Sequence, residues 1–360
     1  MKSLYIHIPF CSSICSYCDF CKLIYNEDLV LEYLNALDNE IKEHYQNEAV
    51  ETIYIGGGTP SALSENALEK LFQITNQINK TSLLEYTFEC NINDINEKLV
   101  NKLIKEGINR LSIGVESFNK EKLEFMERSS NFKDVENKIN MIKSLGISNI
   151  NIDLMYGIPN ETLTILKQDL KQILKLKPTH ISTYSLILEN HTKLSSKDIN
   201  QIDEEIEVKM YDYIRKKLSS NKFNHYEVSN FALNEYESKH NLTYWNNEEY
   251  FGFGLGAHGY IEGFRYENTR NIDEYIKGNY RLDEKLISNQ ELMENEVMLG
   301  LRKISGINLQ RFYDKFGVNI QDVFPVKPLL KNKDLMYKDG YISINPERIY
   351  LMNEILLKLI

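Results

Sequence analysis

The chain has 360 residues, 42% of them hydrophobic and 26% charged, which is enough length and apolar content for more than one packed domain. Its net charge of −10 argues against a broad basic face, so we expect no nucleic-acid partner. An odd count of five cysteines, with no secretory signal pattern and no long apolar run, argues against a disulfide framework and a membrane helix. We therefore expect a cytoplasmic protein with reduced thiols.

The first half of the chain alternates short apolar runs with longer amphipathic segments. We expect strands at 4–8, 52–56, 84–89, 110–115, 149–157 and 179–186. Helical patterns lie between them at 27–46, 63–79, 96–106, 120–145 (as two helices) and 161–176. This alternation predicts a parallel sheet with crossover helices, as a doubly wound sheet or an incomplete barrel. Polar and glycine residues gather at the carboxyl ends of the strands, where α/β barrels build their sites, which favours the barrel.

The pattern changes after about residue 190. A strong helix is expected at 203–220, followed by a stretch rich in glycine and aromatic residues at 225–268. Helices at 289–302 and 307–316, a strand at 341–344 and a last helix at 348–360 suggest a compact winged-helix-like module. The predicted division is an α/β partial barrel at 1–190, an α+β extension at 191–284 and the winged-helix-like module at 285–360.

Four of the five cysteines lie in "CSSICSYCDFC", directly after the first strand. Cys11, Cys15 and Cys18 have the spacing C-x3-C-x2-C, whereas a structural zinc site needs a second knuckle that is missing here. A thioredoxin-like redox pair would occur in a different βαβ context. Three thiolates on one loop can instead hold three irons of a [4Fe–4S] cluster and leave the fourth iron open. We expect a cluster rather than zinc.

The sequence "GGGTP", at 56–60, follows the second predicted strand. Consecutive glycines let the backbone approach a ligand and expose its N–H and C=O groups. A tight turn between strand and helix would use the same residues. Taken alone, the loop leaves both interpretations open.

The motif "CSSICSYC" resembles the C-x3-C-x-aromatic-C signature of the radical S-adenosylmethionine (SAM) superfamily. The resemblance implies a partial (β/α)6 barrel and a [4Fe–4S] cluster whose open iron is chelated by the amino and carboxylate groups of SAM. It also implies that reduction can split SAM into methionine and a 5′-deoxyadenosyl radical. By resemblance Tyr17 would pack near the adenine, the "GGGTP" loop would bind the amino group, and Cys21 would not be a ligand.

Further motifs narrow the resemblance. "LYIHIPFC", "GGGTPS", "RLSIGVESF", "NIDLMYGIP" and "YEVSNFA" are similar to the oxygen-independent coproporphyrinogen III oxidases and to their relatives, the HemW heme chaperones. The resemblance implies that SAM is bound by Tyr5, Gly57, Gly58, Thr59, Glu89, Glu116, Arg128 and Asp153. The chain departs from the family pattern at Glu116, where glutamine is usual, and at Ile92, where proline is common.

"HNLTYW" and "GFGLGAHGY" look like the chaperone type, whereas the oxidases carry a further cysteine where Phe20 stands here. We therefore expect a heme chaperone, with the oxygen-independent oxidase, a radical SAM oxidative decarboxylase, as the alternative. Imidazole, phenol and indole side chains suit heme, although the same residues are common in cores. The heme candidates are His240, Asn241, Tyr244 and Trp245, with His225 and His258 as rivals to His240. Expected partners are heme, heme-acceptor proteins (membrane-associated ones remaining an option) and an electron donor if SAM is cleaved.

Overall fold

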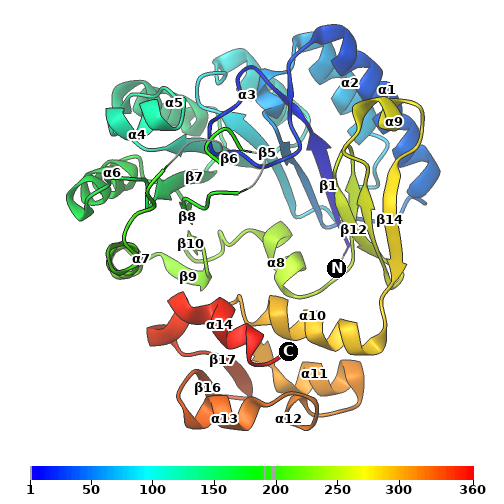
Figure 1. The fold of residues 1–360 in the computed structure, drawn as a ribbon. Helices are drawn as coiled ribbons and strands as arrows, with labels where there is room; N and C mark the ends of the chain where they lie inside the picture. Colours follow the sequence, from blue (N-terminus) through cyan, green and yellow to red (C-terminus); the bar gives the residue numbers. More distant parts are fainter. Residues whose placement is uncertain (1, 190–191, 196–198) are drawn as a thin grey trace.

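The computed structural model describes residues 2–189, 192–195 and 199–360, and a single large sheet organises most of them. The sheet has 12 strands in the order β14-β13-β12-β11-β1-β4-β5-β6-β7-β8-β10-β9. Figure 1 shows that it curves but stays open, with helices along its outer side. The predicted α/β partial barrel is confirmed.

The middle of the sheet is parallel, because each strand is followed by a helix that returns the chain to the same end. Its strands are β1 (Ser3–Ile8), β4 (Thr52–Gly57), β5 (Glu85–Asn91), β6 (Arg110–Glu116), β7 (Asn149–Tyr156) and β8 (His180–Ser185). The connecting helices are α1 (Glu27–His44), α2 (Glu65–Thr75), α3 (Glu97–Lys105), α4 (Lys120–Phe125), α5 (Phe132–Ser144) and α6 (Leu163–Lys175). All six strands and the connecting helices appear where the sequence predicts them.

Side chains alternate along these strands between an apolar outer layer and a polar interior. Leu111, Ile113 and Val115 of β6 are fully buried and point to one face, as do Ile150 and Ile152 of β7. The same alternation on every parallel strand forms the large core beneath the helices. The residues between them face the lumen of the open barrel and are mostly polar, which makes room for a site instead of a packed interior.

The glycine- and aromatic-rich stretch adds strands to both edges of the sheet. On one edge, β10 (Asn230–Ala232) pairs antiparallel with β8 and with β9 (Asn224–Glu227). On the other edge, β11 (Tyr250–Phe253) pairs parallel with β1 and continues through β12 (His258–Ile261), β13 (Phe264–Asn268) and β14 (Arg281–Leu286). Helices α7 (Glu204–Ser219), α8 (Lys239–Trp245) and α9 (Ile272–Ile276) accompany them. Of these elements only α7 was expected from the sequence.

A buried carboxylate ties the β11–β14 edge to the first helix. Glu40 of α1 accepts hydrogen bonds from the Gly254 amide (2.9 Å) and from the Tyr275 hydroxyl (2.5 Å). It also accepts from Asn268 Nδ2 at 2.7 Å and pairs with Arg281 Nη1 at 3.1 Å. Buried charges persist when they are paired and hydrogen-bonded, as here.

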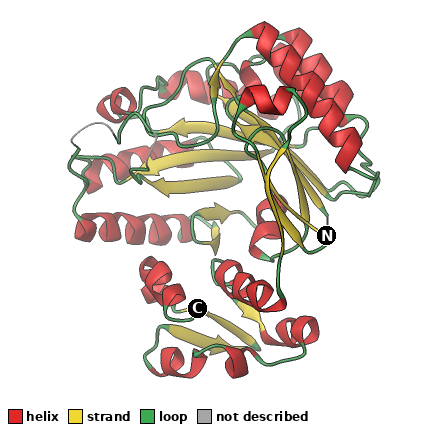
Figure 2. Cartoon of the chain, turned by 45° about the vertical axis from the view of Figure 1, so that its right-hand side comes forward, coloured by secondary structure: helices red, strands yellow, loops and turns green. Residues whose placement is uncertain are grey.

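The C-terminal module lies below the sheet in Figure 2. It contains the three-stranded sheet β15-β17-β16, made of Ile307–Asn308, Tyr341–Ile344 and Leu335–Lys338. The helices around it are α10 (Asn289–Gly300), α11 (Leu309–Phe316), α12 (Ile320–Val323), α13 (Val326–Lys331) and α14 (Met352–Leu357). Helices followed by a small hairpin and a last helix match the winged-helix-like expectation.

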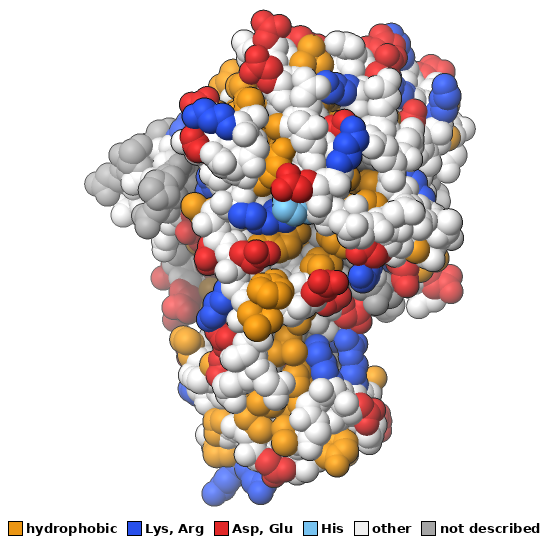
Figure 3. Space-filling view, turned by 90° about the vertical axis from the view of Figure 1, so that its right-hand side faces the viewer, with side chains coloured by type: hydrophobic (Ala, Val, Ile, Leu, Met, Phe, Trp, Pro, Cys, Tyr) orange, Lys and Arg blue, Asp and Glu red, His pale blue; other side chains and the backbone are white. Residues whose placement is uncertain are grey.

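The surface beside β14 mixes charge and apolar groups. Leu282 and Leu286 are exposed on this edge strand, and Phe264 is exposed on its neighbour. Figure 3 shows hydrophobic side chains in a band on this face, interspersed with charged groups of both signs. Within the described part of the chain, no helix is long and apolar enough to cross a bilayer.

Candidate functional site

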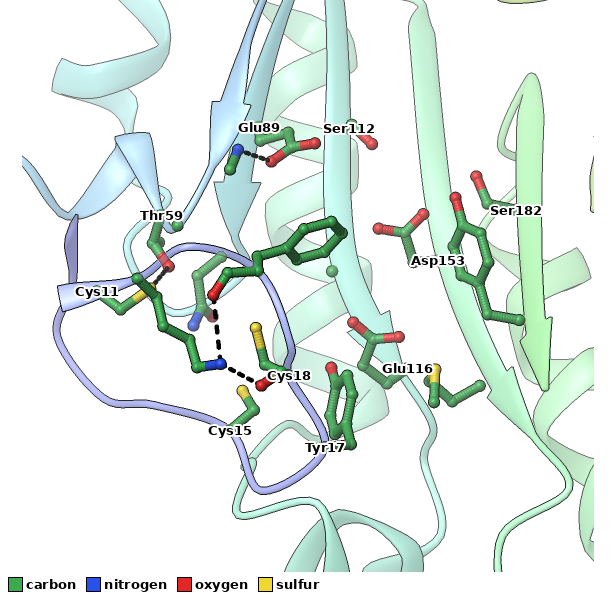
Figure 4. Close-up of a pocket in the computed structure, with 18 of the residues that line it drawn as sticks. Cys11, Cys15, Tyr17, Cys18, Thr59, Glu89, Ser112, Glu116, Asp153 and Ser182 are labelled. Carbon is green, nitrogen blue, oxygen red and sulfur yellow. Dashed lines mark hydrogen bonds between the residues drawn. The ribbon is translucent and has the colours of Figure 1, made fainter. Parts of the chain in front are cut away.

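A cavity of about 380 Å³ opens at the carboxyl ends of the parallel strands. One side of it is the cysteine-bearing loop after β1, and the other side is built by β4 to β8. Figure 4 shows Cys11, Cys15 and Cys18 on that loop, with Glu116 and Asp153 across the cavity. The cavity lies at the rim where sites of parallel α/β barrels form.

The cysteine loop is closed at its base by a short parallel pair, β2 (Phe10–Cys11) and β3 (Leu23–Ile24). Three of its four cysteines, Cys11, Cys15 and Cys18, line the cavity. Cys21 is absent from the lining and instead lies against Gly256, where an added Cβ would be 2.9 Å from the Cys21 Cβ. Cys21 therefore lies apart from the cavity that the other three cysteines line.

The thiols fit a cluster in their donor chemistry. Within the described residues, no three His, Cys, Asp or Glu side chains converge closely enough to hold a single metal ion. Burial raises the pKa of Cys11 to about 11, against a smaller lowering by Thr59, whose hydroxyl donates to its Sγ at 3.4 Å. Arg128 Nη1 lies 3.5 Å from Cys15 Sγ. Hydrogen bonds to cluster sulfurs and nearby charge are the means by which proteins tune [4Fe–4S] centres.

The glycine loop after β4 is held tightly against β1. The Gly58 and Thr59 amides donate to Ile8 O and Phe10 O, both at 2.8 Å, and an added Cβ on Gly58 would meet those same oxygens at 2.8 Å. Gly57 has φ of 111° and donates its N–H to Glu89 Oε2 at 2.9 Å. These three N–H groups are used within the protein, so the loop offers a ligand acceptor oxygens, which suit an ammonium group.

Carboxylates occupy the strand side of the cavity. Burial raises the pKa of Glu89, although hydrogen bonds from Tyr54 (2.6 Å) and Gly57 lower it in part. Burial, followed by repulsion from Glu116, raises the pKa of Asp153 to about 7. Glu116 has φ of 68° at an irregularity in the β6–β7 register, which turns its side chain into the cavity.

Arg128 supplies a cation beside the cysteine loop of the cavity. Its Nη2 donates to Gly114 O at 2.7 Å, and its Nη1 lies 3.9 Å from Glu116 Oε1. Burial alone would lower the pKa of Arg128, but attraction to Glu116 and to Tyr17 raises it overall. The guanidinium therefore stays charged beside the cysteine loop, where it can pair with a ligand carboxylate.

The structure brings most of the predicted SAM residues together. The cavity is lined by Gly57, Gly58, Thr59, Glu89, Glu116, Arg128 and Asp153, and also by Tyr17. Tyr5 is not among the lining residues, and its hydroxyl lies 2.9 Å from His7 Nδ1. Sequence reasoning missed the deeper lining residues Tyr54, Arg110, Ser112, Asn151 and Ser182. The alternation of side chains along a strand could have indicated them, because residues two apart point to the same face. Each of the five stands two or four positions before a rim residue of its strand, or between two buried apolar residues.

The residues of the "HNLTYW" motif form helix α8, which lies at the opposite end of the lumen from the cysteine loop (Figure 1). His240 is 1% exposed, and its two ring nitrogens lie 2.7 Å from Thr52 Oγ1 and 2.7 Å from Tyr244 OH. Burial lowers the pKa of His240 to about 3, so the ring is neutral. In this conformation neither nitrogen is free to ligate iron. Asn241 does line the cavity.

The remaining heme candidates differ in accessibility. The Arg302 guanidinium lies over the ring of Trp245, 5.6 Å from its centroid, and the Trp245 Nε1 has no hydrogen-bond partner among the described residues. His225 stacks on Phe231 with ring centroids 4.3 Å apart, and burial lowers its pKa to about 4. His258 has a side chain that is 56% exposed and lies 3.7 Å from Glu267 Oε1. Of the three histidines named, His258 is the exposed one, whereas His225 is partly buried and His240 is buried.

Comparison with known proteins agrees with this geometry. Residues 5–173 match the family model of the radical SAM superfamily, and residues 287–352 match the HemN C-terminal domain. The fold is similar to that of coproporphyrinogen III oxidase (HemN) from Escherichia coli, with a TM-score of 0.87 at 20% identity, covering 99% of this chain and 89% of that one. The fold and the cysteine-lined cavity define a radical SAM protein, a class that uses a [4Fe–4S] cluster and SAM.

Curated relatives define the family further. The heme chaperone HemW of Bacillus subtilis (strain 168) is 42% identical over 98% of this chain and 96% of its own length. The heme chaperone HemW of Lactococcus lactis subsp. lactis (strain IL1403) is 40% identical over 94% and 91%. The chain belongs to the HemW family of the radical SAM superfamily.

Proposed function

We propose that this chain is a heme chaperone that holds a [4Fe–4S] cluster on Cys11, Cys15 and Cys18, binds SAM at the open iron and passes heme to acceptor proteins in the cytoplasm. The observation that carries the cluster and SAM assignment is the gathering of the Cys11, Cys15 and Cys18 thiols, the Arg128 guanidinium and the carboxylates of Glu89, Glu116 and Asp153 around a single cavity. Similarity to HemW proteins over nearly the full chain supports the chaperone role.

The residues divide the work of holding SAM by their chemistry. Arg128 would pair with the SAM carboxylate, and the acceptor oxygens of the Gly57–Thr59 loop would receive its ammonium N–H groups. Asp153 and Glu116 would accept hydrogen bonds from ribose hydroxyls or from the adenine amino group. Tyr17 would pack against the adenine ring. The cluster, when bound and reduced, supplies the electron that can cleave SAM.

Glu116 distinguishes this chain from relatives that carry glutamine there. A carboxylate accepts but cannot donate, so a ligand group at this position must be a donor. Its negative charge is offset by Arg128 at 3.9 Å. The pair Glu116–Arg128 therefore sums to zero charge, one unit more negative than glutamine beside the same arginine would be.

Heme binding needs an accessible ligand. We keep His240 as a candidate, and its use requires that its hydrogen bonds to Thr52 and Tyr244 be exchanged for iron. His258 needs no such exchange because it is exposed. Variants His240→Ala and His258→Ala, titrated with hemin and followed by the Soret band, separate the two. Loss of the imidazole-ligated band in only one variant identifies the ligand.

The decisive experiment uses anaerobically reconstituted full-length protein in two assays. A chaperone binds hemin stoichiometrically, releases it to an added apo heme protein, and leaves coproporphyrinogen III unchanged in the presence of SAM and dithionite. The oxidase alternative gives conversion of coproporphyrinogen III under the same conditions. That conversion, without hemin binding, would replace the chaperone proposal with the oxidase.

A further inference from the structure

The floor of the cavity is a layer of polar side chains that points into the barrel lumen. On β6, Arg110 and Ser112 alternate with buried Leu111 and Ile113. On the neighbouring strand β7, Asn151 pairs with Ser112 in register and donates to Ser112 Oγ at 2.9 Å. The strand pattern thus places Arg110 one step deeper in the lumen than this hydrogen-bonded pair.

Arg110 is buried without a matched partner. It is 2% exposed. Within the described part of the chain its side chain makes one hydrogen bond, from Nη1 to Thr87 Oγ1 at 3.5 Å, and its Nε has no partner. Among the residues that the structure describes, no carboxylate forms an ion pair with it within the 4.0 Å limit. The positive charge of Arg110 lowers the pKa of Glu89, but it is the smallest of the causes that shift that pKa.

Such a guanidinium is costly to keep, because it cannot lose its proton and a buried charge needs a counter-ion or full hydrogen bonding. Elsewhere in this fold the requirement is met: the buried carboxylate of Glu40 pairs with the partly exposed Arg281 at 3.1 Å. Arg110 differs in lining the cavity, where a ligand can reach it. Its free N–H groups form the planar fork that matches a carboxylate.

Arg110 and Arg128 occupy different places in the cavity. Arg128 contacts Gly114 O, and Gly114 stands four residues after Arg110 on the same strand. At about 3.3 Å per residue, the backbone of Gly114 lies about 13 Å from that of Arg110. The two arginines therefore start from different depths of the cavity, with Arg128 held at the rim beside the cysteine loop and Arg110 rising from the floor.

We propose that the lumen floor is a second anion site, in which Arg110 binds the carboxylate of a ligand other than the SAM at the cluster. The Ser112 hydroxyl, which accepts from Asn151, has its own O–H available to donate to the same group. A porphyrin propionate and a small organic acid share this chemistry. The choice of porphyrin as a probe rests on the proposed heme function, whereas the small-acid probe does not.

The test compares wild type with Arg110→Met, using reconstituted full-length protein. Hemin and hemin dimethyl ester are titrated as one probe pair, since esterification removes the carboxylates. Sodium propionate and propionamide, compared by thermal melting at constant ionic strength, form the other. Arg281→Met is the control, because it removes an arginine whose carboxylate partner, the buried Glu40, is known. SAM binding is measured in each variant.

A carboxylate site predicts that wild type prefers hemin over its ester, or propionate over propionamide, by at least tenfold, and that Arg110→Met removes the preference while SAM binding is retained. Which pair responds identifies the source. Arg110→Met should melt at or above the wild-type temperature, whereas Arg281→Met should melt lower and keep the probe preference. The proposal is overturned if wild type prefers neither charged probe, or if Arg110→Met keeps the preference. It is equally overturned if Arg110→Met melts as low as the control, because Arg110 would then be structural.

Discussion

Arg128 lies against the cysteine loop, with its Nη1 atom 3.5 Å from the Sγ atom of Cys15. This contact joins the segment after β6 to the loop after β1, which are far apart in the sequence. It places a permanent positive charge at the edge of the proposed cluster site. The first prediction follows from this charge.

Replacing Arg128 with Met should leave iron and sulfide content unchanged, since the three thiols remain. SAM affinity should fall at least tenfold, because a charge-assisted hydrogen bond to a carboxylate contributes about 1.5–3 kcal/mol. Equilibrium dialysis with labelled SAM and metal analysis measure the two quantities. Arg128→Lys, which keeps the charge but not the planar fork, should fall between. An unchanged SAM affinity in Arg128→Met would remove this residue from the site.

Three of the four cysteines in the loop should be needed for the cluster, and the fourth, Cys21, should not. Single alanine variants of Cys11, Cys15 and Cys18 should lose the absorption and paramagnetic signals of the reduced cluster, because each cysteine would hold one iron. Cys21→Ala should retain both, since Cys21 lies outside the cavity lining. It serves as the control with equal thiol loss. A Cys21 variant without a cluster would contradict the assignment of ligands.

SAM binding should depend on Asp153 through its charge. The pKa of Asp153 is raised to about 7, mainly by burial and then by repulsion from Glu116. If the carboxylate accepts hydroxyl donors, affinity should rise between pH 6 and pH 8 as its proton is lost. Asp153→Asn should flatten this part of the pH profile, and Glu116→Gln should move its midpoint to lower pH because the repulsion is gone. A wild-type profile that stays in Asp153→Asn would assign the titration to another group.

Glu227 should make the fold less stable as the pH rises. It is fully buried, its Oε1 has no partner, and burial raises its pKa from 4.5 to about 7. The folded state therefore holds this proton more tightly than the unfolded state, so stability falls between about pH 4.5 and pH 7 and stays lower above. Glu227→Gln should be more stable than wild type by on the order of 3 kcal/mol at pH 8, and the gain should vanish near pH 4.5. Denaturant unfolding at both pH values measures it, with exposed Glu235→Gln as the control that should show no such pH dependence.

Glu40 should be among the most sensitive residues of the fold outside the cavity. Its removal takes from Arg281 its carboxylate partner and leaves the buried Tyr275 hydroxyl without an acceptor. Breaking a fully buried ion pair costs about 3–5 kcal/mol, and the 22% exposure of the Arg281 side chain places this pair at the low end of that range. Glu40→Ala should therefore lower the denaturant midpoint strongly, whereas Glu43→Ala, exposed on the same helix, should change stability by about 0.5 kcal/mol or less. Equal effects of the two would contradict the role of Glu40 as the link to β11–β14.

The parallel half of the fold could be predicted because its periodicities are strong. Residues 110–115 alternate strictly, and helices α1 to α6 have apolar faces of helical period, so local pattern and tertiary structure agree. The stretch at 225–268 could not be assigned in the same way. Its strands are short, as in Tyr250–Phe253, and their pairing is decided by partners far away, such as β1. Glycines that fit close backbone approaches, such as Gly252 against His258 O, erase the alternation.

The cavity rim could be predicted from motifs, but its floor could not. Cys11, Gly57 and Arg128 belong to recognisable runs, whereas Arg110 and Ser182 are ordinary polar residues within strands. Their inward direction depends on which face of the sheet the helices cover. His240 is the opposite case, because its motif made it a heme candidate. In the folded chain both of its ring nitrogens are already hydrogen-bonded, to Thr52 and to Tyr244, which the sequence alone does not show.

The division between an aliphatic outer layer and a hydrophilic channel has a consequence for how this fold can evolve. The packing energy comes from the aliphatic layer between strands and helices, so substitutions among the residues that face the channel need not destabilise the fold. One ancestral protein could thereby acquire new ligands by exchanging a few hydrophilic residues, while the cysteine loop stayed the same.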